Sequence, residues 1–192
     1  WMISNGTRVD NALSGFPTIT YAQLSSIVTG NYPGHHDITG NKWFDRKTLV
    51  CRSYLSAATY RLVDGDLRAE TIFERLEDDA TVNIQCPVRR GADRIIDNWM
   101  TSGILWFFGT FHEVDQLMPL RFELVADLAN QVGRWPVFVH AYMPATDEVG
   151  HQHGCLSEKY RDSLRNVDCQ VGRIRAALES AGMTDQDRKS VV

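Results

Sequence analysis

The chain has 192 residues, of which 43% are hydrophobic and 23% charged, and this balance excludes an intrinsically disordered protein. Its net charge is −4 at pH 7 and no basic run is present, so no nucleic-acid-binding surface is predicted. The longest apolar stretch, residues 103–111, is too short to cross a bilayer, so no transmembrane segment is predicted in this chain.

Apolar and amphipathic stretches alternate along the chain, which predicts an α/β protein. A first helix is expected after residues 15–20 and should end at Gly30; its apolar positions are Leu24, Ile27 and Val28. Residues 31–41 are rich in turn-forming residues. A second helix is expected after Asp66, which would be its N-cap; its inner face would hold Ala69, Ile72, Phe73 and Leu76.

The second half contains the clearest elements. Residues 80–88 predict a strand, residues 120–132 a helix, and residues 137–143 a continuous apolar strand of the kind found at the centre of a parallel sheet. A loop after that last strand would hold Asp147, His151 and His153, where open α/β sheets collect ligands. A final helix should run from the Ser157 cap to Gly182, with one apolar stripe formed by Tyr160, Leu164, Val167, Val171, Ile174 and Leu178.

The chain ends are abrupt, because residues 189–192 look like the start of a buried strand. Residues 98–115 are rich in aromatic side chains and are not assigned to an element. The expected organisation is therefore a partial catalytic domain over residues 1–192, with an insertion around 85–118.

The four cysteines, Cys51, Cys86, Cys155 and Cys169, form no C-x-x-C pair, so no structural zinc knuckle is predicted. Free thiols and disulfides both remain open.

Three groups of residues could carry chemistry, and each also has a purely structural interpretation. Thr20 could be an N-cap, or a nucleophile among the free N–H groups of a helix N-terminus. Asp147 and His151 could bind zinc together, or lie separately in a solvated loop. The run from His35 to Asp37 could bind a metal, although a surface turn with a hydrogen-bonded histidine is favoured. His112, Glu113 and His140 are interpreted as structural.

Two ordered groups of residues are more specific than these fragments. The first contains Pro17-Thr18-Ile19-Thr20, then Ser26-Ile27-Val28-Thr29-Gly30-Asn31-Tyr32-Pro33, then His36-x-Ile38-x-Gly40-Asn41-x-Trp43-Phe44-Asp45. The second contains Tyr142-x-Pro144-x-x-Asp147-x-x-Gly150-His151-x-x-Gly154, then Tyr160 and Val167-Asp168-x-x-Val171-Gly172-Arg173-Ile174. Together they resemble the type I phosphodiesterase/nucleotide pyrophosphatase family of the alkaline phosphatase superfamily, whereas residues 48–136 match only loosely.

The resemblance implies an alkaline-phosphatase-like three-layer α/β sandwich with a mainly parallel sheet, incomplete in this chain. It also implies a site with two divalent metal ions, expected to be zinc. Thr20 stands at the position of the family's nucleophile, which also binds one metal, and Asn41 at the position of a hydrogen-bond donor to a phosphate oxygen. Asp147 and His151 stand at the positions of two of the three protein ligands of the other metal.

The chain departs from the family pattern at several points. Tyr21-Ala22-Gln23 replaces the common Phe-Pro-Asn after the nucleophile, which could change the phosphate pocket. Asp37 replaces a glycine, which predicts a positive φ that aspartate tolerates. The family's upstream metal-binding aspartate, its later Asp-His pair and its final histidine have no counterpart, so a fragment truncated at both ends is expected. The similar segment Val63–Arg68 lies in the wrong order and is interpreted as a turn and a helix cap.

The expected function is metal-dependent hydrolysis of phosphodiester or pyrophosphate bonds in a small phosphate ester, such as a nucleotide or a lipid head group. A phosphomonoesterase, phosphonate hydrolase or phospho-group transferase of the same superfamily is the first alternative. A non-catalytic fragment without a complete metal site is the second. The resemblance also suggests an exported or periplasmic protein, although no targeting segment in the chain specifies the compartment.

Overall fold

A computed structural model of the chain describes residues 4, 7–76, 78–97, 103–105 and 108–183. The predicted strand at 189–192 and part of the aromatic stretch at 98–115 lie outside these residues. The elements are α2 (Thr20–Thr29), α3 (Pro33–His36), β1 (Lys42–Asp45), β2 (Val50–Ser53), α4 (Leu62–Asp66), α5 (Ile72–Arg75), β3 (Thr81–Ile84), β4 (Arg94–Ile96), α7 (Phe111–Gln116), α8 (Met118–Val132), β5 (Phe138–Ala141), α9 (Ala145–His153) and α10 (Glu158–Ser180).

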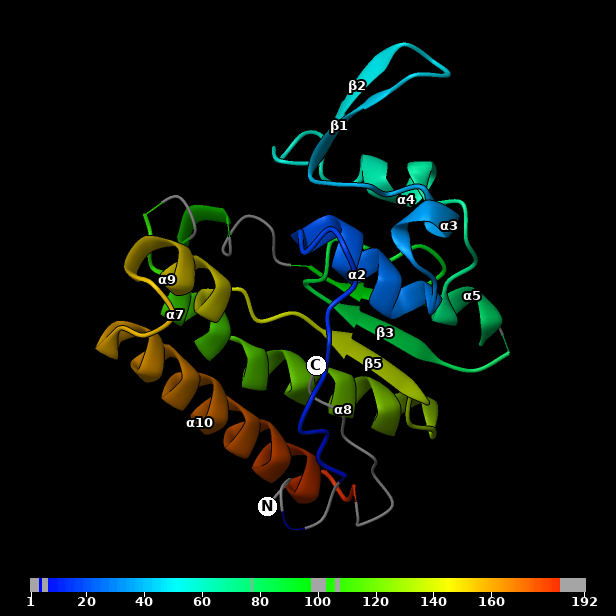
Figure 1. Ribbon diagram of the computed structural model, residues 1–192. Helices are drawn as coiled ribbons and strands as arrows, with labels where there is room; N and C mark the ends of the chain where they lie inside the picture. Colours follow the sequence, from blue (N-terminus) through cyan, green and yellow to red (C-terminus); the bar gives the residue numbers. More distant parts are fainter. Residues whose placement is uncertain (1–3, 5–6, 77, 98–102, 106–107, 184–192) are drawn as a thin grey trace.

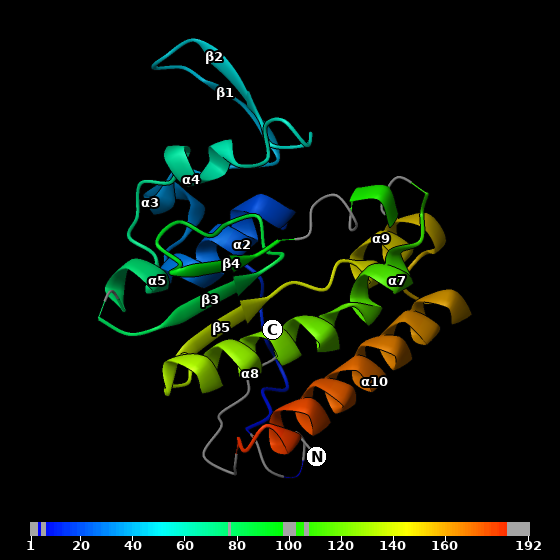
Figure 2. The ribbon, with the colours of Figure 1, turned by 180° about the vertical axis from the view of Figure 1, so that it is seen from behind.

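A parallel sheet with the strand order β4-β3-β5 forms the centre of the molecule, with Val82 opposite both Arg94 and Val139. Helix α2 covers one face of the sheet, and α8 with α10 covers the other (Figures 1 and 2). This arrangement confirms the predicted three layers and the parallel sheet. β1 and β2 form a separate antiparallel hairpin that projects from the body (Figure 1).

Each face of the sheet has its own hydrophobic core, because successive side chains of a strand point to opposite faces. Phe138 of β5 packs with Leu24, Val28 and Phe73 on the α2 side. The core on the other side is built from the remaining faces of β3 and β5 and from α8 and α10; its buried members are Val82, Ile84, Met118, Val125, Ile174 and Leu178.

The placement of the strand at 137–143 was predicted only in part. A parallel strand does form there, but among the described residues β5 pairs with β3 alone and therefore lies at the edge of the sheet. The centre is β3, all four of whose residues are buried. Residues 94–96 of the predicted insertion pair with β3, and the boundaries of an insertion at 85–118 stay a prediction.

The three long helices with clear periodicity are confirmed. α2 ends at Gly30, which has φ +65° and donates its N–H to the Ser26 carbonyl. α8 covers the predicted range, and α10 begins with Ser157 as N-cap, whose hydroxyl accepts from the Tyr160 N–H.

The predicted start of the helix after Asp66 is wrong. Asp66 is the last residue of α4, and the next helix, α5, is capped by Thr71. Thr71 accepts from the Glu74 N–H while Glu74 accepts from the Thr71 N–H, which is a complete capping box. Asp66 instead accepts a hydrogen bond from the Tyr54 hydroxyl at 2.9 Å and pairs with Arg52.

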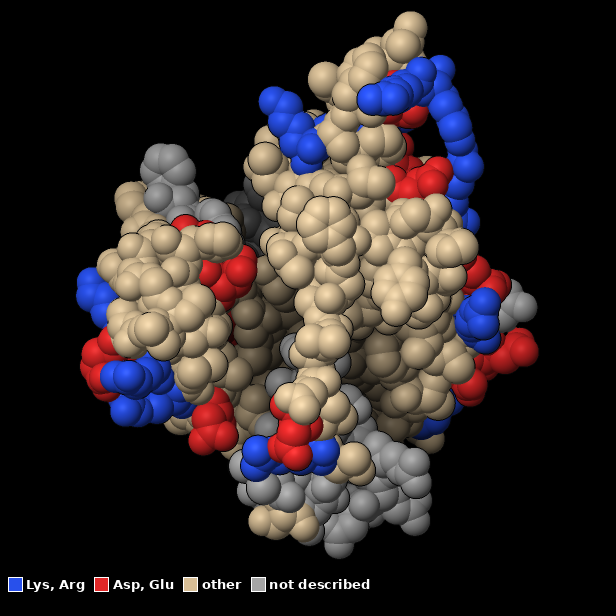
Figure 3. All heavy atoms as spheres, viewed as in Figure 1, with Lys and Arg blue, Asp and Glu red and all other residues tan. Residues whose placement is uncertain are grey.

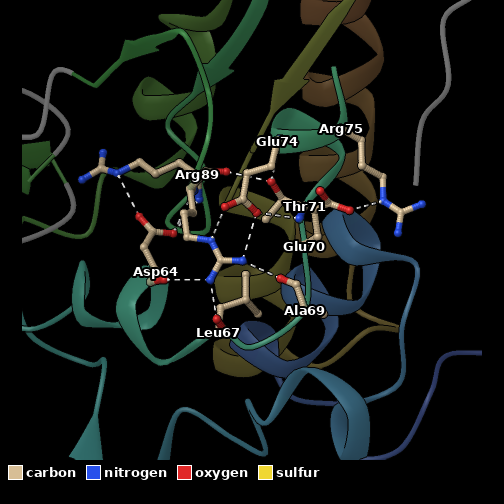
Figure 4. A network of polar contacts seen from close by, with 9 residues as sticks. Asp64, Leu67, Ala69, Glu70, Thr71, Glu74, Arg75 and Arg89 are labelled. Atoms are coloured by element: carbon tan, nitrogen blue, oxygen red, sulfur yellow. Dashed lines mark hydrogen bonds and ion pairs between the residues drawn. The ribbon is translucent and has the colours of Figure 1, made fainter. Parts of the chain in front are cut away.

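A polar network holds the loop after β3 against α4 and α5 (Figure 4). Asp64 accepts the backbone N–H groups of Arg89 and Arg90 at 2.9 and 3.0 Å. The Arg90 guanidinium donates to Glu74 and to the carbonyl oxygens of Leu67 and Ala69. Asp64 therefore anchors a loop, which agrees with the interpretation of the segment around it as structural.

All four cysteines are free thiols, with Cys86 buried and the other three exposed. Across the ranges that the structure describes, no helix combines the length and apolarity that crossing a membrane requires.

Candidate active site

A cleft of about 600 Å³ opens where α2 and α9 approach each other beyond the carboxyl end of β5. It is lined by Ser14, Thr18, Ile19, Thr20, Gln23, Leu24, Asn41, Lys42, Tyr142, Asp147 and His151. Figure 3 shows the surface hollowed between the lobe of α9 and α10 and the column of α2 and its preceding segment, with acidic atoms on the lobe side. All four predicted site residues thus line one cavity.

Thr20 is the first residue of α2 and lies after the N-cap position, which Ile19 occupies. Because Ile19 and not Thr20 occupies the N-cap position, the interpretation of Thr20 as an N-cap is wrong. Within the described part of the chain, the Thr20 hydroxyl has no hydrogen-bond partner. It therefore lies beside the cleft at the positive end of the helix dipole, free to bind a ligand.

Asn41 lies just before β1 and faces the same helix end. Its Oδ1 accepts the backbone N–H of Tyr21 at 3.0 Å. Because a backbone N–H can only donate, this contact fixes which side-chain atom is the oxygen. The Nδ2 group has no partner among the described residues and remains a donor at the cleft.

Asp147 and His151 lie one turn apart on α9, so both side chains project from one edge of the helix. His151 Nε2 and Asp147 Oδ1 are 3.6 Å apart, with 75% and 54% of the side chains exposed. The segment was predicted to be a loop; it is a helix that begins after Pro144. His153 does not line the cleft, and its Nε2 lies 3.4 Å from Lys159 Nζ.

Tyr142 lies between β5 and α9 and lines the cleft. Burial, followed by the nearby carboxylate of Asp147, raises the pKa of the Tyr142 phenol well above its usual range. The residue is therefore a neutral hydrogen-bond donor at the edge of the cleft over the whole physiological pH range.

The run from His35 to Asp37 lies outside the cleft and is structural, as favoured from the sequence. His36 is fully buried, with Nε2 3.0 Å from the Ser26 hydroxyl and Nδ1 accepting the Ile38 N–H. Burial lowers its pKa, so the ring is neutral and both nitrogens are engaged. Asp37 has φ +65°, which confirms the predicted positive φ at the position of the family's glycine.

Three further cleft residues had not been assigned a role from the sequence. Ser14 lies on the segment before α2, and Lys42 opens β1 directly after Asn41. Gln23 had been noted only as a departure from the family pattern. Its position one turn after Thr20 was the one available signal, since residues three apart on a helix share a face.

A complete metal centre is not assembled by these residues. Over the ranges that the structure describes, no three His, Cys, Asp or Glu side chains come together in a metal-binding group. Asp147 and His151 are two neighbouring potential donors on α9, and Thr20 lines the same cleft from α2.

Comparisons with known proteins bear on the family and the fold. The family model for type I phosphodiesterase / nucleotide pyrophosphatase matches residues 1–187. Ectonucleotide pyrophosphatase/phosphodiesterase family member 1 is 26% identical in mouse, 27% in rat and 24% in human, over 93% of this chain. The chain spans about a fifth of the length of these relatives, 18–19%.

A solved structure has the same architecture. Murine ectonucleotide pyrophosphatase/phosphodiesterase 5, as an inactive variant in complex with AMP, superposes with a TM-score of 0.74 at 19% identity. The match covers 95% of this chain and 46% of the other. It confirms the predicted alkaline-phosphatase-like fold, of which this chain forms a part.

Proposed function

Because the chain belongs to the type I phosphodiesterase / nucleotide pyrophosphatase family, we propose that the protein hydrolyses phosphodiester or pyrophosphate bonds in a metal-dependent reaction with Thr20 as nucleophile. One observation carries this proposal. Thr20, Asn41 and the pair of Asp147 and His151 come from three separate segments and line one cleft. Each is a residue type that phosphoryl transfer needs in the corresponding role.

The geometry of Asp147 and His151 fits a zinc ion. When an oxygen and a nitrogen donor both bind tetrahedral zinc at about 2.0–2.2 Å, they lie roughly 3.3–3.6 Å apart. The separation of 3.6 Å between Oδ1 and Nε2 agrees with this value without rearrangement of the helix. Thr20 would provide an oxygen ligand to the second metal.

The proposed reaction is an in-line displacement at phosphorus. Bound divalent metal ions supply Lewis-acid stabilisation of the phosphate and lower the pKa of a coordinated hydroxyl. Thr20 Oγ1 loses its proton to solvent and forms a bond to phosphorus. The bond from phosphorus to the leaving oxygen breaks, and that oxygen takes up a proton from solvent to give the alcohol, or leaves as the nucleoside monophosphate anion. Water then attacks the phosphorus atom of the phosphothreonine from the side opposite the Thr20 oxygen. This step releases the phosphoryl product and restores the Thr20 hydroxyl.

Two further groups of this chain stabilise the negative charge that develops on the phosphate during this step. The Nδ2 group of Asn41 donates to a phosphate oxygen, and the free N–H groups at the start of α2 favour negative charge beside Thr20. A nucleotide is the proposed substrate class, supported by the AMP complex of the murine relative.

The test uses the complete protein with Thr20→Ala, and Thr18→Ala as a matched control, since Thr18 is a second threonine of the same cleft. Bis-p-nitrophenyl phosphate, p-nitrophenyl phosphate and a p-nitrophenyl ester of thymidine 5′-monophosphate are assayed with and without zinc. We expect turnover to vanish in Thr20→Ala and to persist in Thr18→Ala. Activity in Thr20→Ala would remove the nucleophile assignment, and faster turnover of the monoester would overturn the diesterase assignment.

A further inference from the structure

The side chain of Gln23 ties helix α2 to the segment that leads into it. Gln23 Nε2 donates to the carbonyl oxygens of Gly15 at 2.9 Å and Pro17 at 2.7 Å. The Pro17 carbonyl also accepts the backbone N–H of Ile19 at 2.9 Å. The Gln23 amide thus binds the backbone on both sides of Phe16, a few residues before Thr20.

This contact matters because the start of α2 lacks the usual device that fixes a helix entry. Ser, Thr, Asp or Asn at the N-cap normally binds the first free N–H groups. Here the N-cap is Ile19, whose side chain cannot do so. Asn41 Oδ1 accepts one of these N–H groups, that of Tyr21, from outside the helix, and Gln23 adds a different constraint by fixing the incoming backbone with two hydrogen bonds.

The two contacts depend on the donor character of the amide. Both partners are carbonyl oxygens, so only the NH₂ group can make these bonds. An isosteric carboxylate would face both oxygens without a donor and with a negative charge. The side chain itself is partly buried and lines the cleft, so this change acts directly beside Thr20.

We propose that Gln23 is a positioning residue, which holds the Pro17–Ile19 turn so that the Thr20 hydroxyl is aligned for attack; this rests on the proposed function of Thr20. A nucleophile that is displaced by about 1 Å loses roughly a hundredfold in rate. Loss of the two hydrogen bonds therefore lowers kcat, whereas the substrate affinity, which depends on other walls of the cleft, changes little.

The experiment compares the complete protein with Gln23→Glu, Gln23→Met and the control Gln170→Glu. Gln170 is a buried glutamine of α10 that also uses its amide in hydrogen bonds but does not line the cleft. We measure kcat and KM on bis-p-nitrophenyl phosphate, the thermal unfolding temperature, and hydrogen exchange of the Ile19 amide. We expect kcat to fall about 10–100-fold in both Gln23 variants, with KM within about twofold and faster exchange at Ile19.

Thr20→Ala separates the two hypotheses. If Thr20→Ala is inactive while Gln23→Glu and Gln23→Met keep full kcat, the positioning role is wrong and the proposed function stands. If Thr20→Ala keeps its activity, the proposed function fails. A fall in kcat that matches the loss of folded protein, or that Gln170→Glu reproduces, would assign Gln23 a stability role alone and overturn the proposal.

Discussion

Asn41→Asp separates two roles that a single side chain combines. The Oδ1 atom of Asn41 accepts the Tyr21 N–H at 3.0 Å and so satisfies one of the free N–H groups at the start of α2. The Nδ2 group is the proposed donor to substrate. Aspartate keeps an acceptor for the helix and loses the donor for the phosphate, whereas alanine loses both.

The two effects have different sizes. Loss of one preorganised donor in a site of this kind costs about 10²–10³-fold in kcat, or about 2.7–4 kcal/mol of transition-state stabilisation. Loss of a hydrogen bond to a helix N-terminus costs about 1 kcal/mol of unfolding free energy. In a chain of this size, that loss lowers the unfolding temperature by about 2–4 °C.

We therefore expect Asn41→Ala to lose both activity and stability, and Asn41→Asp to lose activity alone. The negative charge of aspartate near the positive end of the helix dipole should preserve or slightly raise the stability. The assays measure kcat/KM on bis-p-nitrophenyl phosphate and the thermal unfolding temperature of the protein. Activity of Asn41→Asp within about threefold of the parent would refute the donor role, and an unchanged unfolding temperature in Asn41→Ala would refute the helix contact.

Three further predictions concern the scaffold. Thr71→Ala removes the capping box of α5 and should lower the unfolding free energy by about 1–2 kcal/mol in urea titrations; a change below about 0.5 kcal/mol would contradict it. Burial raises the pKa of the Cys86 thiol to about 12, so a thiol reagent at pH 8 should label three exposed cysteines quickly and Cys86 only after unfolding. Burial also raises the pKa of the Asp115 carboxyl to about 7, so its stabilising contribution is complete below about pH 4 and is lost as pH rises through 7. Asp115→Asn should therefore reduce the loss of unfolding free energy between pH 5 and pH 8, and an unchanged loss would show that this carboxyl is not responsible.

Local sequence signals predicted the long helices well, because their caps and their periodicity agree. In α10 the predicted serine cap is observed, and Ile174 and Leu178 of the predicted apolar stripe are buried in the core, whereas Leu164 is 47% exposed. The end of α2 was equally readable, since the left-handed conformation after its last turn favours glycine.

The start of the helix near residue 70 shows where local signals conflict. Asp66 and Thr71 are both good N-cap residues, and each is followed by apolar positions. Distant residues support the observed arrangement: Tyr54 and Arg52 bind Asp66, while the Thr71 hydroxyl donates to the Arg90 carbonyl at 2.8 Å. One local signal also favoured Thr71, because Glu74 follows it at the capping-box spacing, whereas Ala69 follows Asp66.

The order of the strands was also outside the reach of the sequence. β3 and the strand around β5 are both apolar, and a continuous apolar run indicates burial on both faces without specifying neighbours. The hydrogen bonds of Gln23 to Gly15 and Pro17 could not be predicted from the sequence either, because the sequence does not indicate which carbonyl a glutamine on a helix will bind. Local patterns already made Thr20, Asp147 and His151 candidates, and the family resemblance gave them roles and added Asn41. The residues that hold them in place are determined by packing.

The helical form of α9 bears directly on how the proposed metal site works. Its sequence contains a glycine and two histidines and was expected to be a loop, yet it is a nine-residue helix with Asp147 and Glu148 in its first turn, where acidic side chains favour the dipole. A Cβ atom at Gly150 would lie 3.3 Å from the ring of Tyr160, so this glycine lets α9 pack closely on α10. The helix sets Asp147 and His151 at a zinc-compatible separation before any metal binds, whereas a loop would have to lose conformational entropy when the ligands converge. Folding of α9 therefore fixes the backbone of both proposed ligands in advance, and we expect a substitution at Gly150 that disturbs the contact with Tyr160 to weaken the proposed metal binding, although neither proposed ligand is changed.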